Sequence, residues 1–408
     1  MPTRADTPFP DDRDPTLPGF PDPYPLYHRL RRDDPVHWSP VADAWMLTRY
    51  ADASAYLRDH RFSRVAYMDA MRAKFGADAP ILKFQSEELA FLDGEKHTWL
   101  KDVVGKAFAP QRIAAMRPRI ETAVTSRLDE IAGAGRMDVI ADYAYPLPAD
   151  VISAMIGVPR QDWITMRQWV DGTIVSRGIV RTPAMMADGD WSARAFGFYL
   201  RTLIKERKAR PSDDLLSALI AAREKDRQMT DDQLVSITET LFAAGHATTR
   251  SLIGLGVLAL LRNPSELTKL RAGPGLITST VEEALRYDSP TQAPSPQIAI
   301  EDVEIGGKKI GKGQAVSVLL GAANRDPARF PDPDRFDIER KNNDHLAFSL
   351  GPHYCLGASL ARAEAQIAIA ALVARTKDLR LTAGEIRYQV AGRFRAPAAL
   401  PVEFTTVR

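Results

Sequence analysis

The chain has 408 residues, of which 45% are hydrophobic and 26% charged, and its formal net charge is +2. This composition is that of a globular protein with a large core, and the near balance of charge argues against a nucleic acid partner. A single cysteine cannot form an internal disulfide, which is typical of a reducing compartment.

No apolar run approaches the roughly 18 residues that cross a membrane. The first 25 residues are rich in Pro and Asp and lack the apolar segment of a signal peptide. We therefore expect a soluble, cytoplasmic protein with no membrane anchor. Neither a repeat nor a low-complexity linker interrupts the sequence, so 1–408 is predicted to be one domain, with 1–20 as an extended arm.

Most of the chain has helical periodicity. The segment 64–91 is predicted to be irregular, and its apolar residues are expected to line a site, because long apolar loops are unusual otherwise. Strands are expected at 36–38 and 45–47. Helices are expected at 24–32, 50–59, 97–107, 111–133, 149–156, 161–176 and 191–209.

The longest predicted helix begins at Thr230, which forms a capping-box pattern with Gln233, and ends before Asn263-Pro264. Such a helix spans roughly 50 Å. Gly245 is unfavourable in its interior, and Thr248 can bend it by bonding the carbonyl four residues back. Two interpretations stay open at this point: a close helix crossing over Gly245, or a groove widened to hold small molecules.

Strand patterns gather late in the chain, at 298–305, at 315–320 and at 379–404. Helix therefore dominates, with small sheets mostly in the last third. The predicted fold class is mainly α, of the α+β type, with a long central helix.

The only cysteine lies in the stretch Phe348–Gly357, which reads as a loop that opens into a helix at 358–374. A cysteine just before a helix start lies near unpaired N–H groups and the positive end of the helix dipole, which favours a thiolate. Gly351 and Gly357 are expected to take positive φ and to allow close approach of a flat group.

Three roles compete for Cys355. It is a buried structural cysteine, a hydrolase nucleophile that needs a histidine base, or the thiolate ligand of a haem iron. The residue types alone leave all three open.

The stretch resembles the haem-binding signature of the cytochrome P450 family, Phe-x-x-Gly-x-(His/Arg)-x-Cys-x-Gly. Phe348, Gly351, His353, Cys355 and Gly357 match every fixed position. The resemblance runs from about residue 20 to the end. It implies the cytochrome P450 fold, haem b with Cys355 as the iron ligand, and a monooxygenase that reductively activates dioxygen. Such enzymes hydroxylate or epoxidise lipophilic small molecules in secondary metabolism or catabolism.

The middle of the long helix is similar to the family's oxygen-binding motif, (Ala/Gly)-Gly-x-(Asp/Glu)-Thr. Ala244, Gly245 and Thr248 match and are the implied catalytic residues, but Ala247 replaces the acid. In the family the alcohol and the acid deliver the protons that O–O cleavage requires. Water, His246 or a substrate group are the candidate replacements.

Two further motifs match the family. Glu283 and Arg286 occupy its Glu-x-x-Arg motif, and Arg335 is the expected third member of a buried network that holds the cysteine loop. His97, Lys101 and His353 stand at positions that bind the haem propionates. Gln297 replaces an arginine that is typical there.

By resemblance, the substrate cavity collects residues from four segments, and their apolar or small side chains suit a lipophilic molecule. These are the segment 64–91, Thr240 with Ala243 and Ala244, Gln292–Ser295, and Arg393–Phe394. A second set forms either a mobile lid or core: Trp169, Met185, Met186, Trp191 and Phe198.

The sequence shows no flavin, nicotinamide or iron–sulfur module, and one cysteine excludes a cluster. Electrons from NAD(P)H are therefore expected to arrive through a separate ferredoxin or flavodoxin. Lys101, Lys106 and Arg112 are candidates to meet its acidic surface. The alternatives are a haem-thiolate peroxygenase or rearrangement enzyme, which Ala247 keeps open, a haem sensor, and a cysteine-dependent hydrolase.

Overall fold

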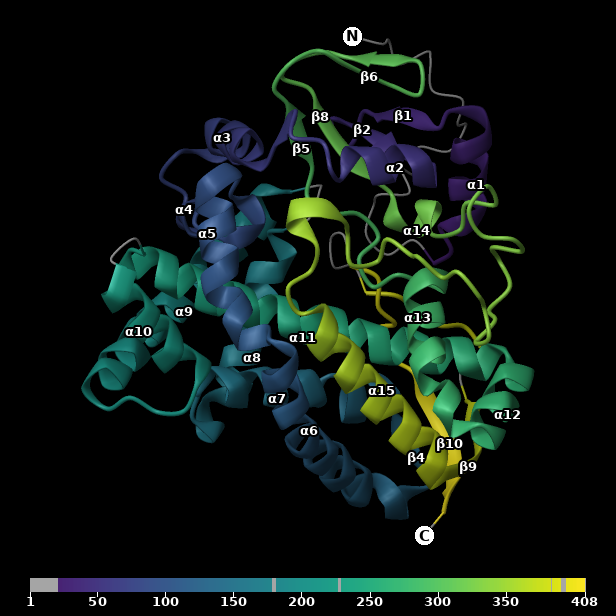
Figure 1. Cartoon of the computed structure of the whole chain (residues 1–408). Helices are drawn as coiled ribbons and strands as arrows, with labels where there is room; N and C mark the ends of the chain where they lie inside the picture. Colours follow the sequence, from purple (N-terminus) through teal and green to yellow (C-terminus); the bar gives the residue numbers. More distant parts are fainter. Residues whose placement is uncertain (1–20, 178–180, 227–228, 383, 390–393, 408) are drawn as a thin grey trace.

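A computed structural model of the chain describes residues 21–177, 181–226, 229–382, 384–389 and 394–407. The arm predicted over 1–20 and the predicted cavity residue Arg393 lie outside the described residues. Helices surround one long central helix, and the strands lie at the edges of the molecule (Figure 1). The helices are α1 (Tyr24–Asp33), α2 (Tyr50–Tyr56), α3 (Arg64–Phe75), α4 (Pro80–Ser86), α5 (Gly94–Gly105), α6 (Pro110–Ile131), α7 (Pro146–Ile156), α8 (Trp163–Val175), α9 (Pro183–Ala209), α10 (Leu215–Asp226), α11 (Asp231–Arg262), α12 (Pro264–Ala272), α13 (Ile277–Tyr287), α14 (Leu320–Ala323) and α15 (Ala358–Arg375).

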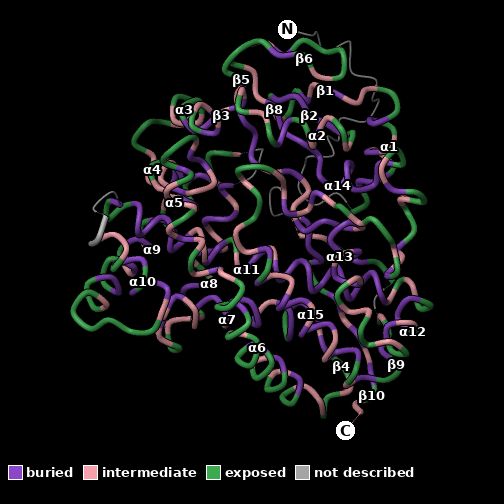
Figure 2. Tube along the Cα trace, in the orientation of Figure 1, coloured by how far each residue is buried: buried purple, intermediate pink, exposed green. Residues whose placement is uncertain are grey.

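The central helix α11 begins at the predicted place. The Thr230 hydroxyl accepts a hydrogen bond from Gln233 N at 3.1 Å, and the Gln233 side chain accepts one from Thr230 N at 2.9 Å. Helix α11 packs against α7, α8, α9, α13 and α15, and it is mostly purple in Figure 2, where buried residues have that colour. By length and composition α11 could cross a membrane, but 78% of its apolar window is buried inside the protein. Its apolar residues therefore serve the core.

Three sheets account for the strands in the described part of the chain. A five-stranded sheet has the order β1-β2-β8-β5-β3, in which β2 and β8 run parallel, a second sheet has the order β4-β10-β9, and β6 and β7 form a hairpin. The strands predicted at 36–38 and 45–47 are confirmed. Their bounds are β1 (Val36–Ser39), β2 (Ala44–Leu47), β3 (Phe62–Ser63), β4 (Arg136–Asp138), β5 (Gln297–Ala299), β6 (Val303–Ile305), β7 (Lys308–Ile310), β8 (Ala315–Val318), β9 (Thr376–Leu381) and β10 (Pro401–Thr406).

The prediction for 379–404 was too long. Strand β9 ends at Leu381 and β10 begins at Pro401, and the part of the intervening segment that the structure describes contributes only isolated bridges. One of these bridges pairs Thr291 with Phe394, which places the latter beside the segment before β5.

The segment 64–91 is not irregular, as was predicted, but contains α3, α4 and a short 3₁₀ helix at Leu89–Phe91. The Ser63 hydroxyl caps α3 by accepting from Ala66 N at 2.9 Å. The apolar residues of this segment pack on α9 in a small core of their own, so most of them face protein rather than a site. Its members are Tyr67, Met68, Ile81, Leu82, Phe91, Met186 and Ala193.

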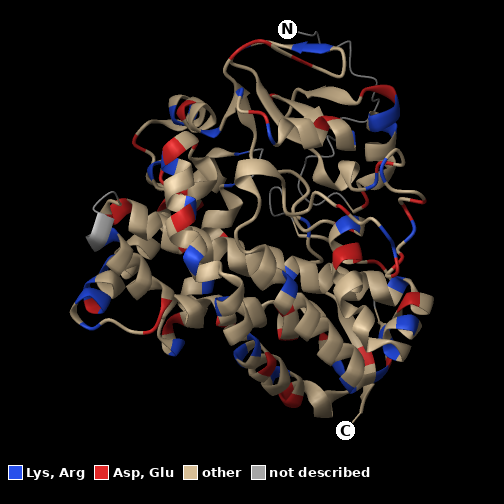
Figure 3. Cartoon of the chain, viewed as in Figure 1, with Lys and Arg blue, Asp and Glu red and all other residues tan. Residues whose placement is uncertain are grey.

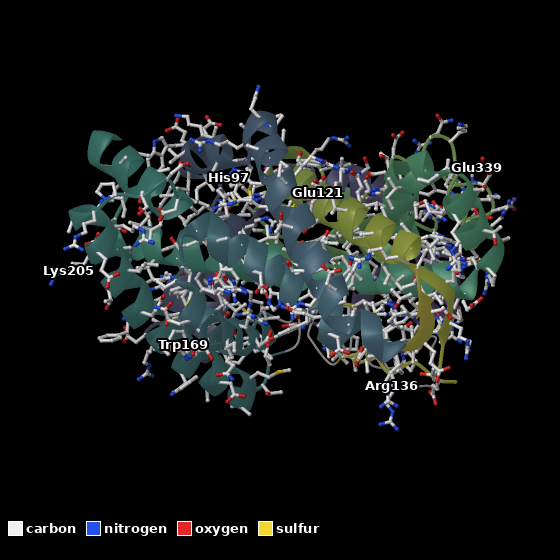
Figure 4. The ribbon with its side chains drawn as sticks, turned by 90° about the horizontal axis from the view of Figure 1, so that it is seen from below. His97, Glu121, Arg136, Trp169, Lys205 and Glu339 are labelled. Atoms are coloured by element: carbon white, nitrogen blue, oxygen red, sulfur yellow. The ribbon has the colours of Figure 1, made fainter. Side chains whose placement is uncertain are left out.

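The predicted helix at 191–209 begins earlier, at Pro183, because Thr182 caps it by accepting from Met185 N. Trp191 and Phe198 are 64% and 78% exposed. Lys205 points outward at the edge of the molecule in Figure 4. Basic and acidic residues are interspersed along the outer helices (Figure 3).

A buried ion network underlies the cysteine loop, but one predicted member is wrong. Arg286 binds both oxygens of Glu283 at 2.8 Å, and both side chains are fully buried. The third side chain is Arg340, whose Nε lies 3.2 Å from both Glu283 oxygens. Arg335 contributes only its backbone carbonyl, which accepts from Arg286 at 3.1 Å, and its side chain is 60% exposed. The family spacing identified the right segment but not the residue.

We expect Arg340→Met to lower the free energy of unfolding by about 3 kcal/mol, because it leaves part of a buried carboxylate without its partner. Arg335→Met, the matched control five residues away, should change the same free energy by no more than about 0.5 kcal/mol. Urea unfolding followed by circular dichroism measures both. Equal losses of unfolding free energy in the two variants would show that the Arg335 side chain also belongs to the buried network.

Candidate active site

The cysteine loop is held in an unusual backbone conformation. Cys355 N donates to Phe348 O at 2.9 Å and Tyr354 N donates to Gly351 O at 3.1 Å, which closes the loop. Ser349 and Gly351 have φ of +62° and +68°. A Cβ at Gly351 would lie 2.7 Å from Leu57 O, so only glycine fits there.

Gly357 does not take the predicted positive φ. Its φ is −84°, and it is the residue that precedes α15. A Cβ at Gly357 would meet no atom within 4 Å, although the residue lines a cavity. The absence of a side chain at Gly357 keeps part of that cavity open next to Cys355.

The expected thiolate is not favoured by the protein alone. Burial raises the pKa of the Cys355 thiol, and this effect outweighs the Gly357 N–H and the charges of Arg362 and Lys101, which lower it. Cys355 lies inside the protein, and its exposed surface faces the cavity. A cation bound at Sγ would supply the missing stabilisation of the thiolate. Among the described residues, no histidine forms a hydrogen bond with the thiol, as a hydrolase would require.

One cavity of about 320 Å³ joins most of the sequence-predicted site residues, although Gly351 is not among those that line it. Helix α5 contributes His97 and Lys101, which lie four residues apart along the helix, and the loop contributes Cys355. Around them the walls are mostly apolar. They include Val104, Phe108, Ile152, Ile174, Ile237, Leu241, Leu252, Leu285, Leu320, Phe348, Leu360 and Phe394.

Helix α11 forms the wall that carries Ala244, Gly245 and Thr248. The Thr248 hydroxyl donates to Ala244 O at 2.6 Å. A Cβ at Gly245 would lie 3.2 Å from Ile152 of α7, so this glycine serves a close helix crossing as well as lining the cavity. The helix stays α-helical through this region, and the predicted groove is not a break in it.

His246, one of the predicted proton sources, does not line the cavity. Its ring is fully buried, and Nε2 lies 3.1 Å from Tyr145 O. Burial, assisted by the charge of Arg250, lowers the pKa of His246 to about 3, so the ring is neutral. The hypothesis of proton delivery through His246 is therefore wrong.

A carboxylate that the sequence analysis missed does line the cavity. Glu364 lies on α15, 3% exposed, and its Oε2 has no hydrogen-bond partner. Burial raises the pKa of Glu364 to about 8. The sequence did carry a signal for Glu364, because an acidic residue stands there within a run of Ala, Leu and Ile. Acidic residues are rarely buried without a partner, so such a position indicates a special role.

Basic and polar donors gather at one edge of the cavity. The rings of His97 and His353 lie 4.2 Å apart, and Lys101 Nζ donates to Pro352 O. In Figure 4 His97 lies within the body of the molecule, whereas Arg136 points away from it. Burial, helped by nearby positive charges, lowers the pKa of His97 to about 4 and that of His353 to about 2.

Arg64 is a further member that the sequence analysis missed. Its side chain is 5% exposed, Nη1 donates to Ala90 O at 3.0 Å, and Nε has no partner. The sequence did not indicate Arg64 as a cavity residue, because the segment that contains it was predicted to be irregular. Arg64 is the first residue of α3. Gln297 lies buried in β5 and is not among the residues that line the cavity.

Sequence and structure comparisons decide the family. The cytochrome P450 family model matches residues 193–273 and 275–377. The chain is 39% identical to the biotin biosynthesis cytochrome P450 of Bacillus subtilis, over 94% of this chain and 96% of that protein. The chain belongs to the cytochrome P450 family. It is also 36% identical to the cytochrome P450 monooxygenase PikC of Streptomyces venezuelae, over 94% and 91% of the two chains.

The fold of this cytochrome P450 agrees with solved structures. The structure of P450BioI in complex with acyl carrier protein ligated to hexadec-9Z-enoic acid superposes with a TM-score of 0.88 at 38% identity, over 94% of this chain and 98% of that one. CalO2 gives a TM-score of 0.89 at 34% identity, over 94% and 96%. The predicted fold class is confirmed, and the chain is an oxidoreductase of the monooxygenase type.

The residues present fit the haem that this family binds. The cavity offers a sulfur on one wall, apolar side chains around it, and donors at one edge, one of which, Arg64 Nε, has no partner in the protein. Cys355 would hold the iron, and the propionates would pair with donors from three segments. Those donors are Arg64, His97, Lys101 and His353.

We expect Arg64→Met and Lys101→Met each to weaken haem binding about 10-fold, because each removes a charged partner of a carboxylate. Lys96→Met, on α5 but exposed and paired with Glu87, is the matched control and should leave the affinity unchanged. The rate of haem transfer to apomyoglobin measures the loss. No change in either cavity variant would exclude these residues as propionate partners.

Proposed function

We propose that this cytochrome P450 holds haem b through Cys355 and uses electrons from a separate protein to oxidise a lipophilic small molecule. The observation that carries the proposal is that Cys355 and the Ala244–Thr248 wall of α11 face the same apolar cavity. When bound, the haem supplies reductive cleavage of dioxygen, which consumes two electrons and two protons, places one oxygen atom in the substrate and releases the other as water. The protein residues exclude bulk water and provide protons.

The substrate class rests on the walls of the cavity and on the relatives. A cavity lined mainly by aliphatic and aromatic side chains favours an apolar molecule with few polar groups. Among the relatives are a 6-deoxyerythronolide B hydroxylase of Saccharopolyspora erythraea and the polyketide biosynthesis cytochrome P450 PksS of Bacillus subtilis. We infer hydroxylation or epoxidation of a secondary metabolite or a related lipophilic compound.

Proton delivery in the proposed mechanism uses Thr248 and Glu364. Ala247, at the position of the missing acid, is buried and is not among the cavity residues. Glu364 lines the same cavity as Thr248 and, with a pKa of about 8, carries a proton at neutral pH. Water between the two side chains would connect a proton donor to the Thr248 hydroxyl, whose own proton bonds Ala244 O.

The electron donor is proposed to be a ferredoxin or flavodoxin that docks near the cysteine loop. Arg112 is 66% exposed at the start of α6 and offers a positive charge to an acidic partner. Lys101 is less suited to this role than predicted, because it lines the cavity and is tied to Pro352. We further propose that the chain is one domain that works in the cytoplasm with NAD(P)H as the source of electrons.

The cysteine ligand is tested by the absorption spectrum of the reduced carbon monoxide complex. Wild-type protein should show the strongly red-shifted Soret band of thiolate ligation, and Cys355→Ser should lose it together with monooxygenase activity. Phe348→Leu, which keeps the loop apolar, should retain the band. A band that persists in Cys355→Ser would overturn the proposal.

The proton route is tested by how well reducing equivalents are coupled to product. Thr248→Ala and Glu364→Gln should each lower the product formed per NAD(P)H about 10-fold and release more hydrogen peroxide, because proton delivery contributes factors of this size or larger. Ser251→Ala removes another hydroxyl that bonds the carbonyl four residues back, outside the cavity, and should stay coupled.

The same measurements address the peroxygenase alternative that Ala247 keeps open. Turnover with hydrogen peroxide alone, at a rate above that with dioxygen and a reducing system, would favour the peroxygenase. In that case Glu364→Gln should leave coupling to NAD(P)H unaffected.

A further inference from the structure

A buried charge cluster lies at the edge of the substrate cavity, and neither the haem nor the proton route uses it. Arg177 follows α8, Glu88 precedes the 3₁₀ helix at Leu89–Phe91, and Glu239 is on α11. Arg177 Nη2 donates to Glu88 Oε1 at 2.5 Å and to Glu239 Oε2 at 2.6 Å. The side chains of Arg177, Glu88 and Glu239 are 5%, 2% and 0% exposed. One guanidinium thus joins three separate segments.

The cluster leaves one donor unused. Thr173 donates to the second oxygen of Glu239 at 2.5 Å, so both oxygens of that carboxylate are occupied. Arg177 Nη1 is buried and has no hydrogen-bond partner in the protein. A buried N–H group without a partner is unfavourable, and guanidinium donors are normally satisfied.

The unused donor belongs to a residue that lines the cavity. Arg177 and Glu88 lie on its wall, as does Thr240, the residue after Glu239 on α11. From Glu239 to Thr248 the rise along the helix is about 14 Å. A ligand that reaches from the haem side to Arg177 therefore extends by roughly that length.

We propose that Arg177 binds the substrate through Nη1 and selects lipophilic molecules with a neutral carbonyl oxygen, such as an ester, amide, thioester or lactone, over free carboxylic acids. This inference rests on the proposed function and names the substrate class of that same site. An oxygen acceptor satisfies the unpaired N–H. A second negative charge is disfavoured, because two carboxylates already contact this one guanidinium.

Three ligands matched in length test the proposal: methyl decanoate, decanoic acid and undecane. Each is titrated into the haem-loaded protein, and the shift of the haem spin state gives its dissociation constant without turnover. In wild-type protein the ester should bind about 10-fold tighter than either the acid or the alkane. Equal affinity for ester and alkane would overturn the proposal.

Arg177→Lys separates binding from structure, because lysine keeps the positive charge between the two carboxylates but has no second nitrogen. We expect the ester to bind about 10-fold more weakly while undecane is unchanged. Arg181→Lys is the matched control, since Arg181 pairs with Gln85 and is not among the cavity residues. Equal losses for ester and alkane would show a purely structural role and reject the inference.

Glu88→Gln tests the charge argument separately. Removing one carboxylate lowers the negative charge beside Arg177, so decanoic acid should bind about 10-fold tighter than in wild-type protein, with the ester little changed. An unchanged preference for ester over acid would reject the role of the two carboxylates. If no ligand shifts the spin state and the carbon monoxide band is absent, the proposed function itself fails. A shift by all three ligands with no preference rejects only the role of Arg177.

Discussion

The sulfur of Cys355 lies in surroundings that disfavour its ionised form, and the proposed role of this residue depends on that constraint. Burial raises the pKa of Cys355 by more than the nearby N–H group and positive charges lower it. The sulfur becomes a stable anion only when a cation binds to it. If this site holds iron as proposed, ligation of the metal would itself stabilise the thiolate, because the charges of the protein alone do not.

The loop that presents the sulfur is held in place by buried polar contacts with neighbouring segments as well as by its own hydrogen bonds. Asn324 accepts from Leu346 N at 2.7 Å and donates to Ser289 at 2.8 Å, while its carbonyl accepts from Arg286 at 3.0 Å. The Glu283–Arg286 pair thereby connects α13 to the segment that precedes the loop. Because each of these groups is buried, loss of any one leaves partners unsatisfied, and the loop position is specified sharply.

Much of the fold and the site was predictable from the sequence, and the failures have physical causes. The capping box of α11 is a local pattern, and it gave the start of the helix correctly. The cysteine signature is local too, and it identified a loop that lines the cavity. The segment 64–91 was misjudged because its helices are short and are stabilised by packing on α9, which no local pattern records. Arg335 was preferred over Arg340 because spacing along the chain does not show which arginine turns inward. Glu364 and Arg64 are recognised only by what surrounds them.

The close approach of Gly351 to Leu57 has a consequence for how this protein can be rearranged. The carbonyl of Leu57, just after α2, sits where any side chain on residue 351 would have to go. The backbone at Leu57 and the turn at Gly351 thus lie close together, with no room for a side chain between them. Chimeras that exchange roughly the first 60 residues with those of a relative should keep Cys355 in place only when the exchanged backbone leaves this one contact undisturbed.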